Sequence, residues 1–144
     1  MCSRALVNAS NLVPRIQTRC RPRNLLNKVS SVLFVSGSYF LQLVEGKEGG
    51  PVNRTIKRMV GDDRHEVKWV HSLVVPTRAF VETIPFLVIH DNEQLSRYFD
   101  ENEWATRHSF GADSAKIARH FLFRLVMIAD PNLLTRNLEP VRRP

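Results

Sequence analysis

The sequence is poor in cysteine and in long apolar runs, and each shortage excludes a class of protein. Its 144 residues include two cysteines, Cys2 and Cys20, which are too few for a disulfide framework, so we expect free thiols in a reducing compartment. No apolar run reaches the ~18 residues that a membrane helix needs, and the longest, residues 121–129, is interrupted by an arginine. Because no secretory apolar segment is present, the glycosylation-type matches at Asn8 and Asn53 are expected to be chance.

Acidic residues are missing from the first 44 positions. These positions hold six basic side chains: Arg4, Arg15, Arg19, Arg21, Arg23 and Lys28. The whole chain has a net charge of +7 and a pI near 10.1, which indicates an acidic partner. The basic stretch resembles a mitochondrial presequence in composition. Residues 33–35 and 39–44 already look like core strands, however, so a cleaved segment would have to end near residue 28.

The residue types that carry enzyme chemistry are not grouped in any familiar pattern. The sequence contains no glycine-rich phosphate loop and no nucleophile elbow. His71 and His90 lie far apart, with no cysteine or acid at ligand spacing, so no metal site is expected. We therefore expect no catalytic residues and no enzyme activity. The basic stretch 15–28 has no interleaved aromatic side chains, which argues against binding single-stranded nucleic acid by stacking.

The clearest structural signal is a β-hairpin. Residues 30–36 are rich in β-branched and aromatic side chains, Gly37-Ser38 supplies a tight turn, and residues 39–45 form the partner strand. The hairpin therefore predicts two neighbouring antiparallel strands.

Weaker signals flank the hairpin on both sides. A first strand is expected within residues 4–9 and a helix within residues 10–28, which Pro22 should end or kink. After the hairpin, Pro51 stands at the first position of a helix with one apolar face, and Gly61 stops that helix.

The second half of the chain continues with strands and then helices. Alternation over residues 67–73 indicates a half-buried strand, and the apolar run 84–89 indicates another. Asp91 and Gln94 form a capping-box pattern for a helix, and a further helix is expected to start near Asp113.

This order of elements predicts an α+β protein. The first seven read βαββαββ, which is a ferredoxin-like mixed sheet with two helices on one face and one added strand. The C-terminal helices are expected to cover the other face. We accordingly divide the chain into a ferredoxin-fold domain, residues 1–108, and a C-terminal helix with a basic extended tail, residues 109–144, that packs on the domain or leaves it.

Residues 30–65 also carry a specific pattern of single residues. A strand and short turn lead into Phe-x-Gln-x-x-Glu-Gly, a helix, and then an Asp, an Arg and a His. The residues concerned are Phe40, Gln42, Glu45, Gly46, Asp63, Arg64 and His65. The pattern resembles that of the BLUF family, the flavin-binding fold of blue-light sensors, and Arg78 and Phe80 resemble the family's later Arg-x-Phe. The resemblance covers roughly residues 4–90.

The resemblance implies a site for FAD or FMN between the two helices, against the sheet. Gln42 matches the family glutamine that contacts the flavin, and Asn24 matches the asparagine, with Asn27 as the alternative. A carboxamide suits this role because it offers both a donor and an acceptor. If a flavin is bound, its binding residues are Asn24, Gln42, Arg64 and His65. For Arg64 a solvated surface position is the alternative, and for His65 a cap or turn position.

The same resemblance indicates that the light reaction is incomplete. The light-active tyrosine of the family falls on Val7, or on Asn8 after a shift of one residue, and neither supplies an electron or a phenolic proton. The family's later Trp and Met positions, which couple the flavin pocket to the fifth strand, read Thr83 and Pro85.

These departures favour a degenerate, non-photoactive module without a cofactor, acting as a structural or protein-interaction subunit docked in a larger assembly. An FAD- or FMN-binding sensor of blue light or redox state is the alternative, and a basic nucleic-acid-binding adaptor is the weaker one. The expected partner is an acidic protein surface or a large assembly, whether mitochondrial, ribosomal or associated with flagellar microtubules; a homodimer or nucleic acid are further candidates. The expected location is intracellular, either cytoplasmic or cytoskeletal, with the mitochondrion as an alternative.

Overall fold

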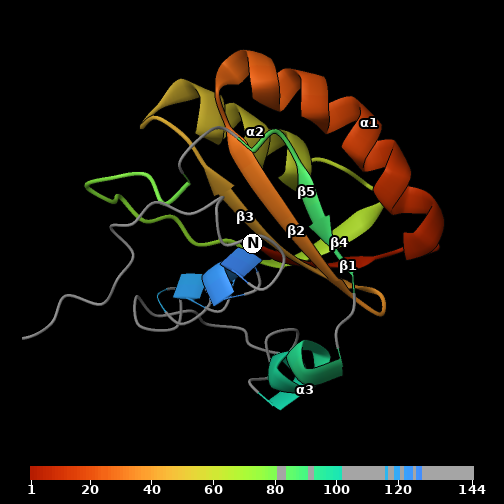
Figure 1. The fold of residues 1–144 in the computed structure, drawn as a ribbon. Coiled ribbons are helices and arrows are strands. Elements are labelled where there is room, and N and C mark those ends of the chain that lie inside the picture. Colours follow the sequence, from red (N-terminus) through yellow and green to blue (C-terminus); the bar gives the residue numbers. More distant parts are fainter. Residues whose placement is uncertain are drawn as a thin grey trace, which may run out of the picture.

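The computed structural model describes residues 1–80, 84–90 and 93–101, together with 116, 119, 120, 122–124, 126 and 127. Within them the elements are β1 (Cys2–Ala5), α1 (Ala9–Asn27), β2 (Ser30–Ser36), β3 (Tyr39–Glu45), α2 (Gly50–Val60), β4 (His65–Trp69), β5 (Leu87–Ile89) and α3 (Glu93–Glu101). The five strands form one mixed sheet in the order β4-β1-β3-β2-β5 (Figure 1). The predicted α+β class and the βαββαββ order are therefore confirmed.

The β2–β3 hairpin has the predicted boundaries. The strands pair antiparallel from Ser30 with Glu45 to Ser36 with Tyr39. Gly37 turns the chain with a φ of 56°, a left-handed value that glycine adopts without the steric cost of a Cβ. Since successive side chains in a strand point to opposite faces, this register places the even-numbered residues of β3 on one face and the odd-numbered residues on the other.

The first strand is shorter and earlier than predicted, because the chain turns into a helix sooner. Leu6 and Val7 are exposed, and Asn8 is the N-cap of α1, with its side-chain oxygen accepting a hydrogen bond from the Ser10 amide at 2.9 Å. The prediction of a strand within residues 4–9 is therefore correct only for its first two residues.

Helix α1 runs through both of its prolines, so the expectation that Pro22 ends it is wrong. Each proline removes one backbone donor, but both lie on the exposed side of the helix. The opposite side is held by tertiary contacts, with Leu12 and Val13 in the core and Asn24 96% buried. Packing thus outweighs the local cost of the prolines, and α1 keeps its full 19 residues.

Strands β4 and β5 differ from the predicted 67–73 and 84–89 because of their neighbours. β4 pairs only with β1, and Trp69 lies opposite Cys2, so the strand has no partner further along. β5 pairs in parallel with residues 32–34 of β2 and is limited to that register. Asp91 and Asp113, which were predicted to begin helices, lie outside the described residues.

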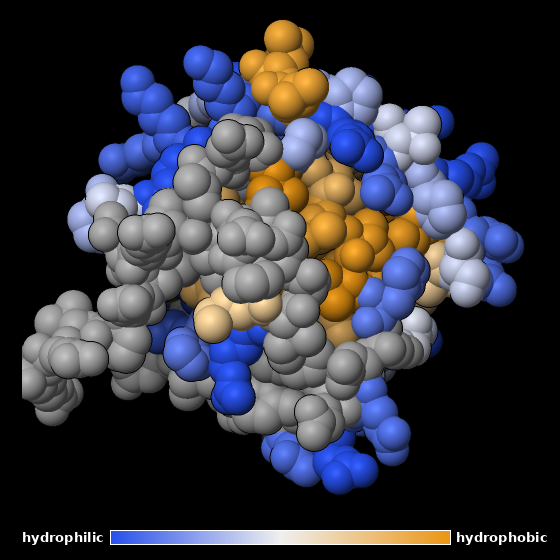
Figure 2. Space-filling view, in the orientation of Figure 1, coloured by the Kyte–Doolittle hydropathy of each residue, from blue (hydrophilic) through white to orange (hydrophobic). Residues whose placement is uncertain are grey.

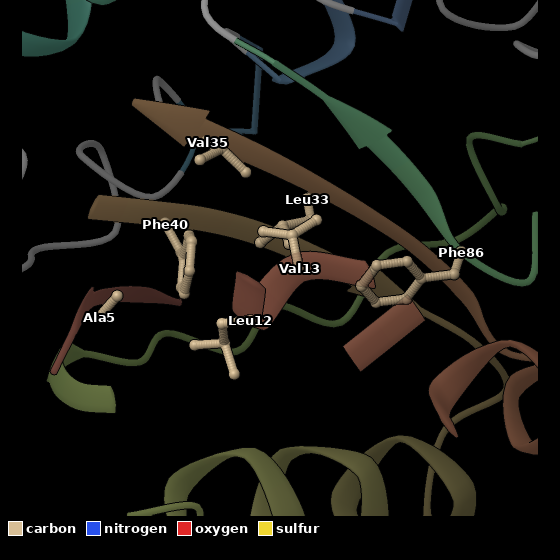
Figure 3. Packing of buried hydrophobic residues seen from close by; sticks show 7 residues of the cluster. All are labelled: Ala5, Leu12, Val13, Leu33, Val35, Phe40 and Phe86. Atoms are coloured by element: carbon tan, nitrogen blue, oxygen red, sulfur yellow. The ribbon is translucent and has the colours of Figure 1, made fainter. Parts of the chain in front are cut away.

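The two faces of the sheet bury different sets of side chains. On one face, Leu12 and Val13 of α1 pack against Leu33, Phe40 and their neighbours (Figure 3). The other face packs against helical residues near the C-terminus, as expected for its cover. Those residues are Leu122, Phe123 and Val126, each at least 94% buried. In Figure 2, hydrophobic residues gather to the right of the centre of the molecule, and hydrophilic side chains border them.

Among the described residues, no helix is long and apolar enough to cross a membrane.

A buried carboxylate joins the end of β3 to the segment that precedes β5. Glu45 is 9% exposed, and its oxygens accept hydrogen bonds from the amides of Ala79 at 2.8 Å and Phe80 at 3.3 Å. Its Oε1 also lies 3.4 Å from Nε of Arg78. Next to it, a Cβ on Gly46 would lie 2.8 Å from Val52 Cγ2, so only glycine fits. The Glu-Gly pair and the Arg-x-Phe motif are thus parts of one structural unit.

Replacing Glu45 with glutamine should destabilise the fold by about 1–3 kcal/mol, because one charged acceptor becomes a donor that faces buried amide donors. Urea unfolding of the full chain measures this. Glu48→Gln, at an exposed position three residues later, is the matched control and should change the free energy of unfolding by less than about 0.5 kcal/mol. Equal effects of the two changes would contradict the role given to Glu45.

Lys28 is the one described residue other than glycine with a positive φ, at 53°, and it caps the C-terminus of α1. Lys28→Gly should therefore stabilise the protein by about 0.5–1 kcal/mol, since glycine carries no Cβ into the left-handed region. Lys57→Gly, on the exposed side of α2, should instead lower the free energy of unfolding by about 1 kcal/mol, because glycine is unfavourable inside a helix. Thermal unfolding compares the two, and a loss of stability in Lys28→Gly would refute the strain argument.

Candidate functional site

A cavity of about 750 Å³ lies between α1, α2 and the sheet. This volume is within the range of small-molecule and cofactor sites, ~300–1,000 Å³. All four residues predicted to bind a flavin, Asn24, Gln42, Arg64 and His65, line it. Asn27, the alternative to Asn24, does not, and its amide caps a carbonyl of its own helix. The structure brings the predicted residues together, while their contact with a flavin remains a prediction.

The two carboxamides are held in place from outside the cavity. Gln42 Nε2 donates to Ser31 Oγ of the neighbouring strand at 2.8 Å, and Asn24 Nδ2 donates to the Pro85 carbonyl at 2.6 Å. Gln42 shares its strand face with Phe40, and Asn24 shares a helix stripe with Cys20, one turn earlier. Each amide is therefore oriented by a neighbour while it lines the cavity wall.

Two polar atoms buried in the cavity wall have no hydrogen-bond partner among the described residues. They are Ser3 Oγ, on β1, and His65 Nδ1, at the start of β4. Ser3 is 1% exposed and His65 is 9% exposed. A buried polar atom left unpaired costs about 1–3 kcal/mol. Both residues line the cavity.

Arg64 is already paired. Its guanidinium donates to both carboxylate oxygens of Asp62, with Nε at 2.8 Å from Oδ1, and its amide donates to the same Oδ1. This hydrogen bond from Arg64 lowers the pKa of the Asp62 carboxyl. The acid that pairs with Arg64 is therefore Asp62, one position before Asp63, which the sequence pattern named. Arg64 faces the cavity as half of an ion pair and not as a free cation.

His65 is neutral in its buried position near neutral pH. Desolvation lowers the pKa of its imidazole below the ordinary 6.5, which the nearby Asp62 only partly opposes. A neutral imidazole keeps one nitrogen as a donor and the other as an acceptor.

The residues expected at the light-active tyrosine position do not face the cavity. Val7 is 51% exposed and Asn8 caps α1, whereas the β1 side chain that lines the cavity near Gln42 is Ser3. Tyr39 and Trp69 pack against the core cluster on the opposite face of the sheet. Among the described residues, therefore, no tyrosine or tryptophan lines the cavity.

Apart from Asn24, the sequence prediction missed the contribution of α1 to the cavity. Arg15, Arg19, Cys20 and Arg23 line it, together with Arg58 of α2. Desolvation raises the pKa of the Cys20 thiol, with nearby arginines acting in the opposite direction. The spacing of four residues between the α1 arginines is visible in the sequence and would have identified them as one helix stripe. The stripe was not predicted, because the prolines argued against a continuous helix.

These groups fit a flavin nucleotide. The carboxamides suit the polar edge of its ring, and the arginines suit its phosphate. Phe40, Leu33 and Met59 supply apolar wall for the ring system.

Comparison with solved structures shows which fold this is. The chain is similar to BlsA in its photo-activated state, with a TM-score of 0.68 and 21% identity over 88% of this chain and 91% of BlsA. It is equally similar to BlrB, a BLUF protein in its dark state, with a TM-score of 0.68 and 18% identity over 89% of this chain and 92% of BlrB. A bacterial light-regulated adenylyl cyclase matches with a TM-score of 0.54 and 15% identity, over 88% of this chain and 37% of the cyclase. No curated protein matches the sequence significantly.

The sequence itself matches a family model over residues 2–84, more than half of the chain. Together with the BLUF neighbours, this match contradicts the prediction that the chain is a non-photoactive structural subunit and favours the flavin-sensor alternative. The prediction rested on the residues that stand at the family's tyrosine, tryptophan and methionine positions, whereas α1 is continuous and the cavity beside it is present. The chain belongs to the BLUF family, sensors of blue light using FAD.

Proposed function

We propose that this chain binds FAD or FMN in the cavity between α1 and α2 and acts as a flavin-based sensor of blue light. One observation carries the proposal: a cavity of about 750 Å³ between the two helices and the sheet is lined by the carboxamides of Asn24 and Gln42 together with Ser3 and His65. The flavin, when bound, supplies absorption of blue light and a change of electron distribution. The chain's own residues would then respond to that change.

Gln42 is the residue best placed to respond. Its amide presents a donor at one end and an acceptor at the other, so a half-turn of the side chain exchanges the two. In the present geometry the donor end bonds Ser31 Oγ at 2.8 Å. A turned Gln42 would offer Ser31 an acceptor, and the Ser31 hydroxyl would reverse from acceptor to donor.

Hydrogen bonds connect Ser31 and its neighbour Ser30 to the segment that precedes β5. The Ser31 amide donates to the Ile84 carbonyl at 2.9 Å, and the Ile84 amide donates to Ser30 Oγ at 3.1 Å. Asn24 adds a second connection through its bond to Pro85. Both routes reach the residues immediately before β5, so we propose that β5 carries the signal to the surface. This route uses Ser31 and Pro85 in place of the family's tryptophan and methionine.

The partner that receives the signal is proposed to be acidic, because the chain carries a net charge of +7. A protein surface and a nucleic acid both meet this condition, and an intracellular location suits either. We propose no enzyme activity for the chain itself.

An absorbance spectrum of the purified chain tests the proposal directly. We expect a flavin band in the blue, released flavin in a denatured aliquot, and a small red shift after blue light. A flavin band that responds to reductant and not to light would replace light sensing with redox sensing. A chain that stays colourless after incubation with FAD and FMN would refute flavin binding.

The variant Gln42→Leu should keep the fold and alter the flavin. We expect about tenfold weaker flavin binding, in line with the loss of one or two hydrogen bonds of about 1 kcal/mol each, and no red shift after light. Gln17→Leu, on α1 but outside the cavity, is the matched control. If Gln42→Leu retained both affinity and the shift, the amide would not be the responding group.

A further inference from the structure

Three arginines of α1 form a row along one edge of the cavity. Arg15, Arg19 and Arg23 are spaced by four residues, so they lie above one another on the helix and span ~12 Å along its axis. They stand beside the stripe that contains Cys20 and Asn24, which faces the sheet. All three line the cavity, whereas Arg21 of the same helix does not.

The row faces further positive charge and little negative charge. Arg58 of α2 lines the same cavity, and the acidic residues in its lining are Asp62 and Asp63. Asp62 is occupied by Arg64 through the bidentate ion pair. Within the described part of the chain, the salt bridges found do not include Arg15, Arg19, Arg23 or Arg58. An unbalanced set of cations around a cavity mouth attracts an anion.

The chemistry of the row identifies the anion. A guanidinium is a planar fork of donors that matches phosphate, and guanidinium groups in a line suit a phosphate or a diphosphate. The same cavity is also lined by Ser3, Asn24 and Gln42, whose side chains are neutral polar groups. The cavity therefore suits a ligand with a neutral polar body and an anionic tail at the α1 edge.

We propose that the arginine row Arg15, Arg19 and Arg23 binds the phosphate groups of the flavin nucleotide, so that the chain selects FMN and FAD over riboflavin. This inference rests on the proposed flavin binding and adds the group that sets selectivity. It also gives the basic N-terminal stretch a role within the site, where the sequence suggested an external acidic partner.

The test compares riboflavin, FMN and FAD binding to the full chain by quenching of flavin fluorescence. The variant Arg19→Gln removes the central arginine of the row, and Arg21→Gln removes the same charge from an exposed position outside the cavity. We expect Arg19→Gln to weaken FMN and FAD binding about three- to tenfold, the range of a partly exposed charge-assisted contact. Riboflavin binding should stay unchanged in both variants, and Arg21→Gln should have little effect on any ligand.

Salt gives a second readout of the same contact. Binding of FMN and FAD should weaken as salt is raised, because exposed charge pairs are screened, while riboflavin binding should not. The inference is overturned if riboflavin binds as tightly as FMN and FAD, or if Arg19→Gln and Arg21→Gln have equal effects.

Failure of flavin binding as a whole is distinguishable from failure of the row. If no flavin binds, the proposed function is refuted. Calorimetric titration with inorganic pyrophosphate then tests separately whether the arginine row binds an anion. Pyrophosphate binding that Arg19→Gln weakens more than Arg21→Gln would support an anion site at α1. Equal weakening by the two variants, or no pyrophosphate binding, would overturn it.

Discussion

The buried carboxylate of Glu45 is the constraint on which the arrangement of the site depends. It accepts hydrogen bonds from two successive backbone amides, at Ala79 and Phe80, and so fixes a long irregular segment to the end of β3. That segment continues to Ile84 and Pro85, which bond to β2 and to α1. A charged group buried in this way is costly unless it is fully paired, and the pairing here attaches the segment before β5 to the end of β3.

The cavity depends on a continuous α1, which forms because packing against the sheet outweighs the helix-breaking effect of its prolines. Prolines at two positions disfavour α1, yet Leu12 and Val13 bury their side chains against the sheet and Asn24 bonds to Pro85. The continuous helix then brings its inward stripe and its arginine row to the same cavity as Gln42. A helix broken at Pro22 would have separated Arg15 and Arg19 from Asn24.

The site differs from the family pattern in its aromatic residues and resembles it in its amides. Ser3 is the β1 residue that lines the cavity, whereas Val7 and Asn8, the positions matched to the family tyrosine, do not line it. The phenol of Tyr39 belongs to the other face. Gln42 and Asn24 are nevertheless placed together and connected to the segment before β5. In the proposed function, recognition of a flavin and transmission from it would use amides and backbone, so neither would require a phenol in the cavity.

The sequence by itself determined the hairpin, the α+β order and the residues Gln42, Arg64 and His65, because these depend on local alternation, turn residues and a compact motif. Tertiary structure alone decided the rest, since it depends on contacts between distant segments. Only packing shows that α1 passes through Pro22 and that β4 ends opposite Cys2. The ion pair of Arg64 with Asp62 and the unpaired state of Ser3 and His65 are likewise properties of the assembled cavity, because a hydrogen-bond partner is defined by position in space and not by order along the chain.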